Sequence, residues 1–243
     1  MKTSIFTLLS NKKLAKNTYE WILEGDVSHI TVPGQFVNIK LDGFYLRRPI
    51  SVCDVGDGKL TLIFKAVGKG TEKMAEMMPG EKLDILTGLG NGYALSESGD
   101  APLLIGGGAG VPPMYLLARR LIAKGKKVTV ILGFGSADEV FYKDEFEALG
   151  AKVIVTTADG SYGIKGFVTD AMEGADYTYF YTCGPEPMLK AIYNKSRTEG
   201  QFSFEERMGC GFGACMGCSC KTKYGNKRIC RDGPVLTKEE IIW

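Results

Sequence analysis

Four cysteines near the C-terminus constrain this chain more than any other feature of its sequence. They follow the spacing C-x4-C-x2-C-x11-C, and glycine and alanine fill most positions around the first three. Such small residues let a backbone wrap closely around an inorganic core and point its N–H groups at the sulfur atoms. The spacing is typical of a binuclear [2Fe-2S] cluster, and it assigns four thiolate ligands: Cys210, Cys215, Cys218 and Cys230.

A zinc site is the main alternative, because zinc also binds four thiolates. Zinc ribbons usually pair two C-x2-C units, whereas the first gap here contains four residues. A fifth cysteine, Cys220, leaves the third ligand formally ambiguous. We assign Cys218, because it preserves the C-x4-C-x2-C register.

The remaining composition argues against several other classes of protein. The seven cysteines are an odd number, which disfavours a disulfide framework. The apolar run within residues 1–13 is too short for a signal peptide, and no stretch is long enough to span a membrane. We therefore expect a reducing, cytoplasmic location. Thirty basic residues balance 28 acidic ones, so nothing in the charge favours nucleic acid as a partner.

The N-terminal part of the chain reads as short strands separated by Gly, Asp, Asn and Pro turns. With one brief helix at 71–78, this pattern predicts a small antiparallel six-stranded barrel in a domain of residues 1–97. The expected strands are 4–10, 18–25, 35–41, 47–55, 59–67 and 81–88.

From residue 101 the pattern changes to apolar strands that alternate with helices, which predicts an α/β domain with a doubly wound parallel sheet over 98–203. The polar segment 97–100 marks the boundary, and residues 204–243 remain for the cluster. The expected strands are 102–106, 127–134, 152–158, 177–184 and 201–206, and the expected helices are 112–125, 139–150, 165–174 and 185–200.

Two motifs in the barrel are suited to a flavin dinucleotide. In the first, Arg48-Pro49-Ile50-Ser51, a guanidinium can grip a pyrophosphate and a hydroxyl can bond the flavin. In the second, Gly70-Thr71, a glycine-opened helix start offers N–H groups to phosphate. Taken singly, the same residues also suit a strand edge and an ordinary helix cap.

Two turns in the second domain are suited to a nucleotide. A glycine-rich turn, with Gly107, Gly108 and Gly110, follows a strand and opens a helix, although its spacing is not G-x-G-x-x-G. The segment Cys183-Gly184-Pro185 ends another strand, and ligands of open parallel sheets lie at the carboxyl ends of the strands. A ligand-free turn and a buried structural cysteine are the alternatives.

The segment after the second strand of this domain bears on the choice between NAD and NADP. Asp138 and Glu139 stand where a 2′-phosphate would favour Arg or Lys, so the segment leans toward NAD. Acidic residues are also favoured at any helix start, and this reading stays open.

The motifs occur in the order found in the ferredoxin-reductase superfamily, which this chain resembles over its whole length. The stretch from Ser203 to Val235 is similar to the electron-transfer subunits of type B dihydroorotate dehydrogenase. The superfamily commonly has an aromatic residue at the position of Ile50. The resemblance implies the same four cysteine ligands and these FAD residues: Arg48, Pro49, Ile50, Ser51, Ile63, Phe64, Lys65, Gly70 and Thr71.

The resemblance also implies a function in pyrimidine biosynthesis. Electrons would pass from the FMN of a dihydroorotate-oxidising catalytic subunit through [2Fe-2S] and FAD to NAD, in a heterotetramer of two copies of each chain. The chain itself offers no base for a carbon substrate, since its single histidine, His29, stands in a turn-like stretch. Carbon chemistry is therefore expected on the partner.

Two other functions remain open. The chain can belong to another NAD(P)H-linked flavin and iron-sulfur complex, such as a sulfide dehydrogenase, a sulfite reductase or an electron-bifurcating transhydrogenase. It can also be a metal-binding module without enzymatic activity that has kept a reductase fold. An absorption spectrum separates the non-enzymatic module from the two redox functions. The identity of a co-purifying protein separates a dihydroorotate dehydrogenase subunit from a subunit of another complex.

Overall fold

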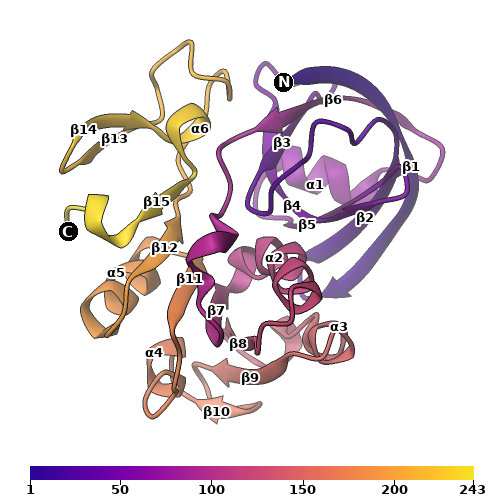
Figure 1. Cartoon of the computed structure of the whole chain (residues 1–243). Helices are drawn as coiled ribbons and strands as arrows, with labels where there is room; N and C mark the ends of the chain where they lie inside the picture. The colour runs from indigo at the N-terminus through magenta and orange to yellow at the C-terminus, as the bar shows by residue number, and fades with distance from the viewer.

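The computed structural model describes all residues, 1–243, and Figure 1 shows a barrel, a layered sheet and a C-terminal segment packed together. The barrel is antiparallel and six-stranded, as the sequence predicts, and it is closed with the strand order β1-β2-β5-β4-β3-β6. Its strands are β1 (Lys2–Ala15), β2 (Thr18–Glu24), β3 (Phe36–Ile39), β4 (Arg48–Gly56), β5 (Lys59–Lys65) and β6 (Lys82–Leu89).

The helix of the barrel, α1 (Lys69–Glu76), begins two residues before the predicted start at residue 71. Thr71 is the third helical residue, and its hydroxyl oxygen accepts hydrogen bonds from the backbone N–H groups of Val67 and Gly68. The side chain thus caps the helix from inside its first turn, which is why the helix starts upstream of Thr71.

The second domain contains a seven-stranded sheet with the order β10-β9-β8-β7-β11-β12-β15. All neighbouring pairs are parallel except β12 with β15. The strands are β7 (Pro102–Gly107), β8 (Thr129–Phe134), β9 (Lys152–Thr157), β10 (Ile164–Lys165), β11 (Tyr179–Cys183), β12 (Gly200–Ser203) and β15 (Val235–Thr237). The helices are α2 (Pro112–Ala123), α3 (Lys143–Ala148), α4 (Val168–Ala171) and α5 (Glu186–Lys195).

Some predicted bounds in this domain are wrong. The helix expected at 165–174 is only α4, because Ile164 and Lys165 pair with β9 as an edge strand. The helix expected at 139–150 is reduced to α3, since Tyr142 just before it has a left-handed φ of 66°. The strand expected at 201–206 ends at Ser203, where its pairing with β15 stops.

Helices cover both faces of the sheet, which confirms the doubly wound arrangement. On one face, α2 packs between the sheet and the barrel, and its side chains Met114, Leu117 and Leu121 are fully buried. On the other face, α4 and α5 share a core with the C-terminal segment. The two apolar layers join all parts of the chain into one packed body.

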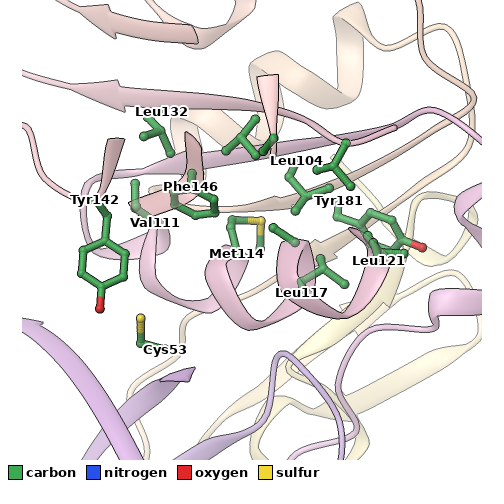
Figure 2. Close-up of a cluster of buried hydrophobic side chains, with 14 of the residues drawn as sticks. Cys53, Leu104, Val111, Met114, Leu117, Leu121, Leu132, Tyr142, Phe146 and Tyr181 are labelled. Atoms are coloured by element: carbon green, nitrogen blue, oxygen red, sulfur yellow. The ribbon is translucent and has the colours of Figure 1, made fainter. Parts of the chain in front are cut away.

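The contact between barrel and sheet is shown in Figure 2, where Cys53 of β4 faces Tyr142 and the helix α2. Cys53 is fully buried in this layer. The Tyr142 hydroxyl donates to a carboxylate oxygen of Glu20 on β2, 2.7 Å away. Arg119 of α2 pairs with Asp54 of β4 at 2.8 Å.

The C-terminal segment contains a hairpin of β13 (Ser219–Thr222) and β14 (Gly225–Arg228), and then α6 (Ile229–Asp232). The chain next returns to the sheet as β15. Asn91, in the connection between barrel and sheet, binds this return: its side-chain amide donates to the Val235 carbonyl at 2.8 Å and accepts from the Val235 N–H at 3.1 Å. None of the helices combines the length and the apolar composition needed to cross a membrane.

Candidate functional site

The four assigned cysteines lie in a glycine-rich loop and at the helix that follows the hairpin. Cys218 precedes β13, and Cys230 lies in α6. Both are buried, whereas Cys215 is exposed and Cys210 is partly exposed. Arg228 ties the loop to α6, because its guanidinium donates to the Gly213 carbonyl and to the Asp232 carboxylate, each at 3.0 Å.

The thiols form two pairs. In the first pair, the N–H groups of Ala214 and Cys215 donate to the Cys210 sulfur at 3.2 and 3.4 Å. In the second pair, the Cys230 N–H donates to the Cys218 sulfur at 3.4 Å. Burial raises the pKa of Cys210, but backbone N–H groups, led by that of Cys215, outweigh it and lower the pKa to about 6. Burial, followed by the neighbouring Cys218 thiol, raises the pKa of Cys230 to about 12.

The pairing of the thiols suits a binuclear cluster. Two irons that take two thiolates each match the two cysteine pairs. The N–H groups that point at sulfur are the donors such a cluster uses.

Cys220 lies outside the two pairs. It belongs to β13, and its half-buried side chain lines a cavity on the inner side of the segment. Burial raises the pKa of its thiol, and Glu206 adds to the effect. Its place on the cavity wall agrees with a ligand set that does not include it.

The flavin motifs of the barrel meet at one point. Arg48 begins β4, and its guanidinium lies across the first turn of α1. A Cβ atom at Gly70 would stand 2.1 Å from Arg48 Nε, so only glycine allows this approach. The guanidinium also packs over the Phe44 ring, 4.7 Å from its centroid. A cation and helix N–H groups thus face the same space, which suits a pyrophosphate.

The third segment with predicted flavin residues is Ile63–Lys65, at the end of β5. Its side chains point in different directions, as strand geometry requires. Ile63 packs toward the sheet and Phe64 into the barrel core. Lys65 pairs with Glu139 at 3.0 Å. All three line a narrow crevice together with Gly108 of the glycine-rich turn, so this strand end lies beside the expected nucleotide turn.

The two nucleotide turns pack directly against each other. A Cβ atom at Gly110 would lie 2.1 Å from the Cys183 carbonyl oxygen, and one at Gly107 or Gly184 would collide with Met188. The parallel pairing of β7 with β11 sets this contact, since it aligns Cys183 with Gly106. At Gly110 the neighbouring atoms are backbone, so only glycine allows the two turns to pack this closely.

Asp138 and Glu139, which bear on the choice between NAD and NADP, form ion pairs that the sequence did not indicate. Asp138 pairs with Lys16 of the barrel at 3.1 Å, and the Lys16 N–H donates to the Asp138 carbonyl at 2.9 Å. Glu139 pairs with Lys65. Both acids therefore link the nucleotide domain to the barrel.

A cavity of about 690 Å³ lies where the three parts of the chain meet. The barrel contributes Arg48 and Pro49, and the sheet contributes Gly184 and Pro185. Sequence reasoning assigned no individual role to several residues that line it: Glu186, Glu205, Glu206, Arg207, Met208, Lys221 and Trp243.

Comparison with known proteins now identifies the family. A model described as the iron-sulfur cluster binding domain of dihydroorotate dehydrogenase B matches residues 205–242, and an oxidoreductase NAD-binding domain model matches residues 104–194. The "dihydroorotate dehydrogenase B (NAD(+)), electron transfer subunit" of Shouchella clausii (strain KSM-K16) is 43% identical over 256 residues, 99% of this chain and 98% of the relative. The chain belongs to this family of electron transfer subunits.

Other members and solved structures agree with this membership. The subunit of the same name from Bacillus mycoides (strain KBAB4) is 43% identical over 258 residues, 100% of this chain and 99% of the relative. The structure of an NADH-dependent reduced ferredoxin-NADP oxidoreductase, solved for insight into flavin-based electron bifurcation, superposes with a TM-score of 0.89 and 31% identity over 98% of this chain and 89% of that one. The ferredoxin reductase of carbazole 1,9a-dioxygenase, at 23% identity and a TM-score of 0.70 over 79% of this chain and 64% of that one, shares the fold.

Membership confirms the prediction of an NAD-linked oxidoreductase subunit for electron transfer, with FAD, an iron-sulfur cluster and NAD as its redox groups. A metal-binding module without enzymatic activity is thereby set aside.

Proposed function

We propose that this electron transfer subunit carries electrons from a dihydroorotate-oxidising partner to NAD. The observation that carries the proposal is the cavity where the barrel, the sheet and the cluster segment meet. The start of β4, the Cys183-Gly184-Pro185 turn and the cluster segment all contribute to its wall. A flavin ring in this cavity would lie against both the nucleotide turn and the cluster segment. Bound flavin exchanges a hydride with nicotinamide and single electrons with an iron-sulfur cluster.

Residues of this chain have distinct roles in the proposal. Arg48 and the first turn of α1, with Gly70 and Thr71, hold the FAD pyrophosphate. Pro49, Ile50, Ser51 and the strand Ile63–Lys65 hold the rest of the flavin. Gly107, Gly108, Gly110 and the Cys183-Gly184-Pro185 turn receive NAD. The segment 133–139, which ends in Asp138 and Glu139, has no Arg or Lys for a 2′-phosphate and therefore favours NAD over NADP. In this proposal, residues 1–97 form the FAD-binding domain, residues 98–203 form the NAD-binding domain, and residues 204–243 form the cluster-binding segment.

The partner and the location are also proposals. We infer an FMN-containing catalytic subunit of dihydroorotate dehydrogenase, two copies of each chain, a cytoplasmic location and a role in pyrimidine biosynthesis. The names of the relatives support the partner's reaction. His29, the single histidine, is exposed and does not line the cavity, so this chain supplies no imidazole base for a carbon acid there.

A second candidate function rests on the NADH-dependent reduced ferredoxin-NADP oxidoreductase structure, which matches nearly the whole chain. In that case the partner is a subunit of a bifurcating complex instead of a dihydroorotate dehydrogenase. The identity of 43% to dihydroorotate dehydrogenase B subunits against 31% to this structure favours the first function.

The decisive experiment combines the purified chain with candidate partners under anaerobic conditions. Alone, it should pass electrons from NADH to an artificial dye but should not oxidise dihydroorotate. With an FMN-containing dihydroorotate dehydrogenase chain, it should couple dihydroorotate oxidation to NAD reduction. Removal of the cluster should abolish coupling and spare the NADH-to-dye reaction. Dihydroorotate oxidation by this chain alone, or coupling without the cluster, would contradict the proposal.

A further inference from the structure

Asn38 is the one polar residue of β3, and its side chain is almost completely buried, with 1% exposure. The other residues of this strand, Phe36, Val37 and Ile39, are apolar. Val37 and Ile39 point into the barrel core, so Asn38 points outward on the opposite face. Directly across the ladder stands Pro49 of the flavin motif.

The outward face of Asn38 carries the cluster loop. The Asn38 side-chain amide donates to the Cys210 carbonyl oxygen at 3.3 Å, across 172 residues of sequence. Gly211 follows with a φ of +79°, and a Cβ atom there would stand 2.4 Å from Asn38 Nδ2. The loop of the first cluster ligand therefore rests directly on this amide.

The other half of the amide has no partner. Asn38 Oδ1 is buried and accepts no hydrogen bond. A buried acceptor without a donor lowers the stability of a fold, and an apolar side chain would avoid that loss. The strand itself is held independently, because Arg47 donates to the Asn38 carbonyl at 3.3 Å and pairs with Asp84 at 2.9 Å. Stability alone does not account for an amide at this position.

We propose that Asn38 is a positioning residue that fixes the loop of Cys210 against the strand that holds the flavin. The proposal rests on the function proposed above, in which cluster and flavin exchange electrons. Through this hydrogen bond, Asn38 sets the orientation of the Cys210 backbone relative to Pro49. Polar contacts in the shell around a cluster tune its electronic properties, so the effect has a spectroscopic signature.

The test compares Asn38→Leu with wild type and with Asn11→Leu. Asn11 is a control for the loss of an amide away from the cluster: its side chain is half-buried, its amide donates to the carbonyls of Met74, Ala75 and Met77 at 3.4, 3.0 and 2.8 Å, and its Oδ1 also lacks a partner. The measurements are thermal unfolding, iron content, the electron paramagnetic resonance spectrum of the reduced cluster, and the rate at which NADH reduces the cluster.

We expect Asn38→Leu to fold with an unchanged or higher melting temperature and to keep its NADH-to-dye activity. Its cluster spectrum should change, and NADH should reduce the cluster about tenfold more slowly, since small displacements of reacting groups have large effects on rate. Asn38→Asp, which keeps the shape but replaces the donor with a carboxylate that repels the Cys210 carbonyl, should change the spectrum in the same way. Asn11→Leu should leave spectrum and rate unchanged.

A wild-type spectrum and rate in both Asn38 variants would overturn the proposal. Loss of folding in Asn38→Leu would also overturn it, by showing that the amide serves stability. These measurements need no partner chain. Failure of the wild-type protein to couple with a dihydroorotate dehydrogenase would therefore count against the proposed function only.

Discussion

At the residue scale, two cysteines separated by one residue have different surroundings. Cys218 is buried beside Cys230, whereas Cys220 faces the central cavity. Cys220→Ser should keep about two irons per chain, as one binuclear cluster requires. Cys218→Ser should lose most of them, because serine is a poor ligand for iron in place of a thiolate. Iron analysis after anaerobic purification measures both, and equal iron in Cys218→Ser and wild type would show that the register is wrong.

A second prediction at this scale concerns the cation at the start of β4. Charge-assisted hydrogen bonds contribute about 1.5–3 kcal/mol, so Arg48→Ala should weaken FAD binding about 10- to 100-fold. Gly70→Ala should weaken it too, because its Cβ atom would displace the guanidinium. Titration of the apoprotein with FAD gives the affinities. The control is Arg120→Ala, because Arg120 of α2 is exposed and has no ion pair. An equal loss of FAD affinity in Arg48→Ala and Arg120→Ala would refute the assignment of Arg48 to FAD.

At the element scale, β15 makes the cluster segment part of the sheet. Leu236 is 2% exposed, packs in the layer beneath α5, and pairs with Phe202 of β12. Leu236→Ala should lower the free energy of unfolding by about 2–5 kcal/mol, as for other large apolar side chains in cores.

Because β15 belongs to both the cluster segment and the seven-stranded sheet, we also expect the cluster segment and the sheet to unfold together. Urea unfolding, followed by cluster absorbance and by far-ultraviolet circular dichroism, should give coincident transitions in wild type and in Leu236→Ala. Exposed Leu9→Ala on β1 should change stability little. A cluster transition well separated from that of the sheet would show that 204–243 folds as an independent module.

At the scale of the whole molecule, the exposed side of the cluster loop is the expected partner surface. Phe212 and Met216 are 45% and 56% exposed and flank the exposed Cys215. Replacing both with serine should weaken partner binding at least about tenfold, since buried apolar anchors commonly contribute more than about 1 kcal/mol each. Calorimetric titration measures this. Tyr224 at the tip of the hairpin is 64% exposed, and the control variant Tyr224→Ser should bind the partner normally. A normal affinity in the Phe212 and Met216 double variant would exclude the cluster loop as the partner surface.

Much of this molecule follows from local pattern. The strand and helix periodicities predicted the barrel and the doubly wound sheet, and the cysteine spacing predicted a ligand set whose members the fold brings together in pairs. These features depend on residues close together in sequence, where side-chain alternation, glycine turns and ligand spacing act directly. The helices α3 and α4 were predicted, but too long, because the left-handed φ of Tyr142 and the pairing of β10 with β9 override the local preference.

Only the tertiary structure decided how these parts meet. The antiparallel return of β15, the cavity at the three-way junction, the pairing of Asp138 and Glu139 with Lys16 and Lys65, and the bond from Asn38 to the Cys210 carbonyl all join distant segments. Such contacts depend on which surfaces come together when the whole chain packs, and the cost of closing a long loop varies only slowly with its length. A single sequence determines the motifs and their order, while the packing of barrel, sheet and segment decides which motifs face one cavity.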